Sequence, residues 1–171
     1  QVRDEVMGIF SFFEDIPIGP FQQHVKWDWT TWSEYRQSFE KNVSVPLNYA
    51  SYVGHIPLRL AAMGMDAWER AATPAEIAKM AAEEVARFGL PPKVAFLSHS
   101  NYGSSSRKSA LKMRAARNLF AAANPGIECD GEMLGDSALD PVVRSRTVHD
   151  ATLSGEANVL ICPNLDAANI L

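Results

Sequence analysis

The residues from Ser98 to Lys108 combine small, hydroxylated and basic side chains in a stretch that could hold an anion. The stretch follows a short apolar run and precedes a helical pattern, so backbone N–H groups and a helix N-terminus converge there. Such a turn forms a concave set of donors, and the helix dipole adds about half a positive charge. The hydroxyl donors are Ser98, Ser100, Ser104, Ser105 and Ser106, with Asn101 and Gly103 suited to a tight turn and Arg107 and Lys108 able to hold a phosphate.

The same pattern admits a plainer interpretation. Ser-rich turns cap many helices, and a basic helix face is often only solvated. No GKS or GKT sequence follows the glycine, so the stretch is not a Walker loop. Local chemistry therefore leaves both phosphate binding and simple capping open.

Helices and strands that would position this stretch can be predicted on both sides of it. Thr73 followed by Pro74 and Glu76 is typical of a helix start, and Gly89 ends the apolar helical spacing. The other predicted elements are strands at 94–97 and 159–162 and a helix at 109–123, where Leu111, Arg114, Ala115, Leu119 and Ala122 recur at helical spacing. This alternation predicts an α/β fold with a mostly parallel sheet flanked by helices, and ligands at the carboxyl ends of its strands.

Composition limits the class of protein. The 171 residues are 47% hydrophobic and carry a formal net charge of -4, which predicts one sizeable core and no broad basic face for nucleic acid or membrane. The apolar runs are too short for a membrane span, so we expect a soluble cytoplasmic protein. Cys129 and Cys162 fall in segments that resemble the edges of buried strands, and they do not have CxxC spacing. We therefore expect two reduced thiols.

Several motifs in the second part of the chain occur together in one known family. The segments are "PPKVAFLSHSNYGSS", "SALKMRAA", "ECDGEMLGDSAL" and "LSGEANVLICPNLDAANI". In this order they resemble the phosphate acetyl/butyryl transferase family, in particular the phosphotransacetylase-like domain at the C-terminus of bacterial NADP-dependent malic enzymes. The resemblance covers about residues 73–171. It implies an isocitrate-dehydrogenase-like α/β fold, a cleft for coenzyme A, acetyl-CoA, acyl phosphate or phosphate, and a homodimer.

The resemblance also implies site residues. The phosphate-side loop would comprise Ser98, Ser100, Asn101, Gly103, Ser104 and Ser105, and the cleft would be lined by Asp130, Gly131, Glu132, Asp136, Pro163, Asn164, Asp166 and Asn169. In active transferases a Ser-Arg pair and an acid follow the "NLDAANI" segment, beyond Leu171. We therefore expect acyl-CoA or acyl-phosphate binding without turnover, and no metal; acyltransferase activity of the phosphate acetyltransferase type is the alternative if the segment is active.

The first part of the chain resembles a different family. "WDWTTWSEY" and "YVGHIPLRLAAMG", within about residues 1–80, are similar to N-acyl-D-amino-acid deacylases of the amidohydrolase superfamily. Those enzymes need a metal cluster, yet His24, His55, His99 and His149 form no HxH or HxxxH pair. His55 is the one candidate for a pocket in this part, and a satisfied turn residue is the simpler interpretation.

The two resemblances predict an amidohydrolase-like segment at 1–72 and a phosphotransacetylase-like segment at 73–171, packed as one globular unit. A chimera or engineered recombination is the simplest origin for such a chain, and a natural fusion is the alternative. Besides the leading hypothesis of an acyl-CoA or acyl-phosphate binding domain, a metal-dependent deacylase fragment and a structural α/β module without activity stay open.

Overall fold

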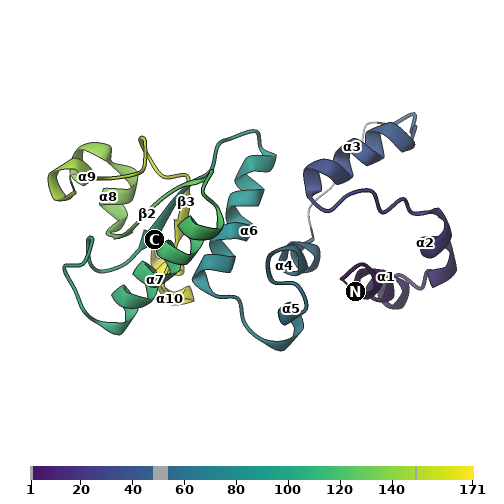
Figure 1. The fold of residues 1–171 in the computed structure, drawn as a ribbon, viewed down its shortest axis with the longest axis horizontal. Helices are drawn as coiled ribbons and strands as arrows, with labels where there is room; N and C mark the ends of the chain where they lie inside the picture. Colours follow the sequence, from purple (N-terminus) through teal and green to yellow (C-terminus); the bar gives the residue numbers. More distant parts are fainter. Residues whose placement is uncertain (1, 48–53, 149) are drawn as a thin grey trace. The chain divides into compact units, whose positions relative to one another are not determined.

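The computed structural model describes residues 2–47, 54–148 and 150–171 of the chain. Helices α1 to α6 come first, followed by β1, α7, β2, α8, α9, β3 and α10 (Figure 1). The chain divides into two compact units, Gln1–Ala71 and Ala72–Leu171. The predicted anion-binding stretch lies in the second unit.

The first unit consists of short helices joined by loops. They are α1 (Val2–Phe13), α2 (Ile18–His24), α3 (Trp32–Asn42), α4 (His55–Met63) and α5 (Asp66–Glu69). Residues 48–53 of the strand-like "LNYASYV" lie outside the described residues. His55, which the sequence suggested as a turn residue, is exposed and is the first residue of α4.

Aromatic side chains provide the clearest packing in the first unit. The ring centroids of Trp27 and Trp29 lie 5.1 Å apart, and the Tyr35 ring lies 4.9 Å from Trp29 and 5.1 Å from Trp32. Pairs of aromatic rings at such distances add to the energy of burial. These three tryptophans therefore act together as a packing device.

Three parallel strands form the sheet of the second unit. They are β1 (Lys93–Leu97), β2 (Glu128–Met133) and β3 (Val159–Ile161), in the spatial order β2-β1-β3. The helices around them are α6 (Pro74–Arg87), α7 (Lys108–Ala123), α8 (Gly135–Leu139), α9 (Pro141–Thr147) and α10 (Leu165–Ile170). Because the strands are parallel, their carboxyl ends meet at one edge of the sheet, where loop 98–106 begins.

Both faces of the sheet are covered. Helices α6 and α7 pack on one face through Ala78, Ala82, Val94, Phe96, Met113, Ala116, Phe120, Cys129, Val159 and Ile161. The other face packs on α8 and on residues 153–157 through Ala95, Leu97, Met133, Ala138, Leu153 and Ala157. This two-sided cover explains why β1 reads as a continuous apolar run. The prediction of a parallel sheet flanked by helices is confirmed.

The predicted helices and strands around the site agree with the structure, but the apolar stripe of α7 does not mark its buried face. The sequence predicted elements at 74–88, 94–97, 109–123 and 159–162, and each differs from the observed bounds by no more than one residue at either end. In α7, however, Leu111 and Leu119 are 45% and 65% exposed, while Ala110, Met113, Ala116 and Phe120 are buried. The helix is apolar on two sides, and spacing alone did not distinguish the side that meets the sheet.

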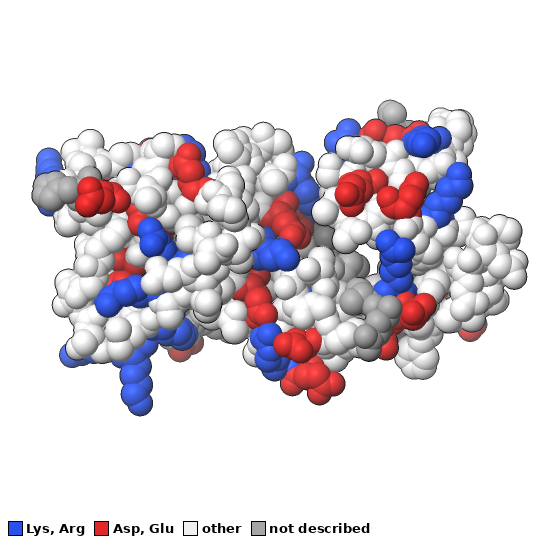
Figure 2. Space-filling model, in the orientation of Figure 1, with Lys and Arg blue, Asp and Glu red and all other residues white. Residues whose placement is uncertain are grey.

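The surface carries charges of both signs. On the face shown in Figure 2, blue and red side chains are interspersed over the described residues. Within the described parts of the chain, no helix has the length and apolar character needed to cross a membrane. Cys129 is buried in β2, and Cys162 is half-buried just after β3, both as free thiols.

Candidate functional site

A local irregularity in β2 aims the Glu132 side chain toward loop 98–106. Strand pairing runs from Phe96 opposite Gly131 directly to Leu97 opposite Met133, so Glu132 is the extra residue of a β-bulge. Gly131 has a φ of +126°, and a Cβ there would lie 2.5 Å from the Phe96 carbonyl oxygen. Only glycine fits this position, which explains the Asp-Gly-Glu sequence of the strand.

The Glu132 carboxylate lies at the centre of loop 98–106. Its Oε1 accepts from the Ser100 hydroxyl, the Gly103 N–H and Arg114 Nη2, each at 2.9 Å. Its Oε2 accepts from Arg114 Nε at 2.9 Å, so the guanidinium binds both carboxylate oxygens. The Glu132 side chain is fully buried, and the loop and helix α7 together satisfy it. Glu132 therefore braces the loop from inside.

The protonation state of Glu132 follows from these contacts. Burial alone would raise the pKa of the Glu132 carboxyl, but Arg114, the Gly103 N–H and the Ser100 hydroxyl stabilise the carboxylate more strongly. Together they lower its pKa to about 2. Glu132 is thus an ionised acceptor at neutral pH.

The loop also directs several backbone groups inward. The N–H of Ser98 donates to the Met133 carbonyl at 2.8 Å, and the N–H of Tyr102 donates to the Glu132 carbonyl at 2.8 Å. Asn101 Oδ1 accepts from the N–H of Leu134 at 2.7 Å, which ties the loop to the end of β2. The anion at the centre of this predicted cradle is therefore the protein's own carboxylate.

The outer side of the loop, next to the start of α7, carries the exposed donors. Arg107 precedes the helix and Lys108 is its first residue, and both side chains are exposed. The first N–H groups of a helix have no acceptor within the helix, so this end favours an anion. His99 joins the group, because its Nε2 lies 3.1 Å from Ser105 Oγ and its Nδ1 lies 3.4 Å from Ser109 Oγ.

The remaining predicted site residues lie at the same edge of the sheet but play other local roles. Asp136 is exposed in α8, and its Oδ1 accepts from the N–H of Ser137 at 2.6 Å. Asn164 caps α10, since its Oδ1 accepts from the N–H of Ala167 at 2.8 Å. Lys112 of α7 donates to the carbonyl of Pro163 at the end of β3. The edge thus gathers residues that follow all three strands.

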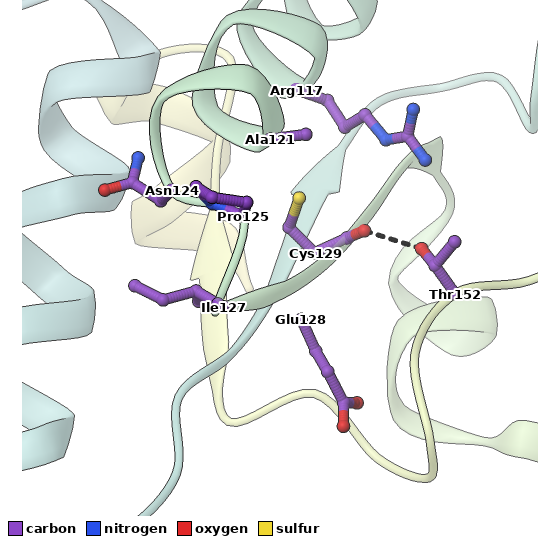
Figure 3. A pocket seen from close by; sticks show the side chains of 9 residues that line it. Arg117, Ala121, Asn124, Pro125, Ile127, Glu128, Cys129 and Thr152 are labelled. Carbon is purple, nitrogen blue, oxygen red and sulfur yellow. Dashed lines mark hydrogen bonds between the residues drawn. The ribbon is translucent and has the colours of Figure 1, made fainter.

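Two hollows flank β2. The first, of about 370 Å³, is lined by Gly103, Arg114 and Glu132 of the site and by Tyr102, Arg117, Asn118, Asp130, Gly131, Val148 and Asp150. The second, of about 290 Å³, lies beside the start of β2 (Figure 3), where the Thr152 hydroxyl donates to the Cys129 carbonyl at 2.6 Å. Only the first hollow contains predicted site residues.

A second loop, residues 150–157, is fixed beside the same strand. Asp130 is buried, and its Oδ2 accepts from the N–H of Thr152 at 2.7 Å, while its Oδ1 lies 3.7 Å from Arg117 Nη2. Arg144 of α9 is also buried and donates to the carbonyls of Ser137 at 2.9 Å, Leu153 at 3.1 Å and Gly155 at 2.5 Å. This loop is therefore held both through its N–H groups and through its carbonyl groups.

Sequence reasoning missed three residues of this arrangement. Arg114 was counted in a helical stripe, although its place in a run of basic residues on α7 could have suggested an internal partner. His99 was weighed only as a metal ligand, and Ser109 only as the start of a helix. Among the described residues there is no group of three or more His, Cys, Asp or Glu side chains arranged to hold a metal ion.

Comparisons with known proteins concern the second unit. Residues 69–171 match the family described as "Phosphate acetyl/butaryl transferase". The chain is 54% identical to the NAD-dependent malic enzyme of Rhizobium meliloti over 96 residues, which is 56% of this chain and 12% of that protein. It is 44% identical to the phosphate acetyltransferase of Paracoccus denitrificans over 79 residues, which is 46% of this chain and 25% of that protein.

A solved structure is similar in fold over the same region. The EutD phosphotransacetylase from Staphylococcus aureus superposes with a TM-score of 0.54 and 37% sequence identity, covering 57% of this chain and 31% of that chain. The chain therefore spans well under half the length of each of these relatives.

Proposed function

Because this chain belongs to the phosphate acetyl/butyryl transferase family through residues 69–171, we propose that its second unit binds an acyl phosphate or a coenzyme A ester. The ligand would bind at the carboxyl edge of the sheet, with its phosphate or pyrophosphate group at the start of α7. The observation that carries this proposal is the exposed pair Arg107 and Lys108 at the N-terminus of that helix, which has no side-chain cap.

The residues around this point have separate parts in the proposal. Ser105 and Ser109, bridged by His99, lie beside the helix N-terminus and would contact the phosphate. Glu132 and Arg114 would hold the loop in shape, and Asp136 and Asn164 would border the ligand from the ends of the neighbouring strands. Ligand contact would fall to the outer side of the loop, because Glu132 occupies its centre.

We propose binding without turnover for this segment. In an acyl transfer, a coenzyme A thiolate would attack the acyl carbonyl carbon of an acyl phosphate, forming the C–S bond of a thioester and releasing phosphate with the C–O bonding electrons. A base must first take the thiol proton. Glu132 does not suit that role, because Arg114, Ser100 and Gly103 already donate to its carboxylate.

Thermal unfolding with acetyl-CoA, coenzyme A and acetyl phosphate tests the proposal. A ligand at a hundred times its dissociation constant adds about 2.7 kcal/mol, which raises Tm by several degrees for a chain of this size. We expect this rise in the parent protein and its loss in the Arg107→Ala, Lys108→Ala double variant. A Lys26→Ala, Lys41→Ala double variant removes the same charge from the first unit and should respond like the parent.

Two outcomes would contradict the proposal. A parent Tm that none of the three ligands changes would mean that the edge binds none of them. Thioester formation from acetyl phosphate and coenzyme A, lost in the same double variant, would show turnover and overturn the restriction to binding.

We also propose that the chain forms a homodimer. Leu111 and Leu119 are exposed on the side of α7 that faces away from the sheet, and Ala115 lies between them on the same stripe. Apolar side chains gathered on one helix face favour association with another surface. Sedimentation velocity should give a dimer for the parent and a smaller species for Leu119→Lys, whereas a parent monomer would contradict this proposal.

A further inference from the structure

We infer that Ser104 presents a hydrogen-bond acceptor to the ligand and therefore selects an N–H or S–H group over an anionic oxygen. This inference rests on the proposed function and assigns a role to one hydroxyl of the same site. A serine hydroxyl could act as donor or acceptor toward a ligand. In this loop, its internal contacts decide between the two roles.

The direction of the hydrogen bonds in this loop is set first by the buried Glu132 carboxylate. As an ionised group it can only accept hydrogen bonds. The Ser100 hydroxyl lies 2.9 Å from Glu132 Oε1 and must donate its single proton there. Ser100 is itself buried, so its hydroxyl has no second arrangement facing water.

The hydrogen bond between Ser100 and Ser104 therefore also has one direction. Ser104 Oγ lies 3.1 Å from Ser100 Oγ, and Ser100 has no proton left to give. In the hydrogen bond between these two hydroxyls, Ser104 is therefore the donor and Ser100 the acceptor. The N–H of Asn101 donates to Ser104 Oγ at 3.1 Å and fills one of its lone pairs. The second lone pair of Ser104 remains, on a side chain that is exposed.

This chain of bonds gives Ser104 a definite electrostatic character. Hydrogen bonds in series polarise one another, so the carboxylate charge increases the electron density on Ser104 Oγ. A phosphate oxygen placed against that lone pair would be repelled. An amide N–H or a thiol S–H would be attracted, and the pantetheine arm of coenzyme A carries both groups. Ser104 thus distinguishes this arm from the phosphate end, which Arg107 and Lys108 would hold. Ser100 and Glu132 act as positioning residues.

Calorimetric titration with coenzyme A and with acetyl phosphate, each on the parent and on Ser104→Ala, tests the selection. Loss of one hydrogen bond should weaken coenzyme A binding about 3- to 10-fold. Acetyl phosphate binding should stay within about twofold or become tighter, because Ser104 gives it no donor. Unchanged coenzyme A affinity, or an equal loss for both ligands, would overturn the inference.

Two further variants sharpen the same test. Ser100→Ala releases the Ser104 proton, so acetyl phosphate binding should tighten while coenzyme A binding weakens. Ser104→Thr keeps the hydroxyl and should retain the preference of the parent. Ser145→Ala, at an exposed serine of α9, is the matched control and should change neither affinity. Tighter acetyl phosphate binding in Ser104→Thr would contradict the polarity assigned to Ser104. So would acetyl phosphate binding in Ser100→Ala that is no tighter than in the parent.

Neutron diffraction from crystals of the deuterated protein separates this inference from the proposed function. It should place the Ser104 deuteron between Ser104 Oγ and Ser100 Oγ without any ligand. A deuteron pointing away from Ser100 would overturn the assigned polarity even if both ligands bind. A parent that binds neither ligand would overturn the proposed function, and with it the ligand assigned to Ser104.

Discussion

Two loops beside strand β2 differ in the buried charges that hold them, because loop 98–106 surrounds one carboxylate, whereas loop 150–157 contacts both the Asp130 carboxylate and the Arg144 guanidinium. Loop 98–106 surrounds the Glu132 carboxylate, which accepts from the Ser100 hydroxyl and the Gly103 N–H. Loop 150–157 contacts the Arg144 guanidinium, which donates to the Leu153 and Gly155 carbonyls. The anion therefore occupies donors of its loop, and the cation occupies acceptors of the other.

The difference shows how a buried charge decides which groups remain for a ligand. Burying a charge is unfavourable unless groups of the opposite polarity surround it. In loop 98–106 this requirement uses up the donors at the centre, so an external anion has to meet the outer side and the start of α7. The position of the exposed cations Arg107 and Lys108 agrees with that division.

Removing the glycine between the two buried acids should affect both loops at once and have the largest effect. In Gly131→Ala, the new Cβ would lie 2.5 Å from the Phe96 carbonyl oxygen at a φ of +126°. We expect the free energy of unfolding to fall by about 4 kcal/mol, because neither the strand backbone nor the bulge can yield without moving Asp130 or Glu132. Urea denaturation measures this loss.

The control for that prediction is a second glycine. A Cβ at Gly126 would meet no heavy atom within 4 Å. Gly126→Ala should therefore change the free energy of unfolding by less than about 0.5 kcal/mol. Equal losses in the two glycine variants would mean that the bulge does not support the loops.

Acid should loosen loop 98–106. The pKa of Glu132 lies at about 2 in the folded protein and at 4.5 in its ordinary state, so the unfolded chain binds the proton first as pH falls. The contribution of Glu132 is complete above about pH 4.5 and is lost as pH falls toward 2. It amounts to roughly 3 kcal/mol.

Comparison with Glu132→Gln isolates this contribution from other acids. Urea denaturation between pH 6 and pH 2 should give a steeper fall for the parent than for the variant, since only the parent carries the titrating carboxylate at this position. Parallel curves for the two proteins would show that Glu132 does not stabilise the fold through its charge.

Loop 150–157 should lose stability when its buried cation Arg144 is removed. Arg144→Met leaves the Leu153 and Gly155 carbonyls without their donor, and we expect a loss of about 2 kcal/mol. Because a guanidinium stays charged throughout, the loss should be the same at pH 6 and pH 3. Arg146→Met, at an exposed arginine of the same helix, should cost less than about 0.5 kcal/mol. A loss in Arg144→Met no larger than the loss in Arg146→Met would contradict the role of Arg144 in holding this loop.

The smallest effect should come from the tie between loop 98–106 and the end of β2. Asn101→Ala removes the acceptor for the Leu134 N–H and should cost about 1 kcal/mol. Asn101→Asp keeps an oxygen at that position and should retain most of the stability. Protection of the Leu134 amide from hydrogen exchange reports this bond directly, and unchanged protection in Asn101→Ala would count against it.

The sequence predicted some of these elements well and others poorly, for identifiable reasons. The start of helix α6 is predicted by Thr73, Pro74 and Glu76, because capping is a local interaction. The structure contains the expected capping box. Strand β2 was indicated only around Cys129, because Asp130, Gly131 and Glu132 look like a loop. Polar side chains inside a strand are unusual unless other segments satisfy them, and those partners lie far away along the chain.

The sequence likewise predicted some features of the candidate site and not others. The serines, Gly103 and the basic pair mark the region, but the pairing of Arg114 with Glu132 spans 18 residues and depends on how α7 packs against β2. The resemblance of residues 1–80 to amidohydrolases, the deacylase alternative and a chimeric origin stay predictions. The boundary suggested near residue 72 likewise stays a prediction about two segments of different ancestry.

By itself, the sequence determined to within one residue where α6, β1, α7 and β3 begin and which loop precedes α7, because caps, glycines and apolar spacing act over a few residues. Tertiary structure decided which side of α7 is buried, since Ala110 and Met113 rather than Leu111 meet the sheet. It also decided that Glu132 fills the loop and turns its donors inward. Charge burial is settled by distant partners, and only the folded chain brings those partners together.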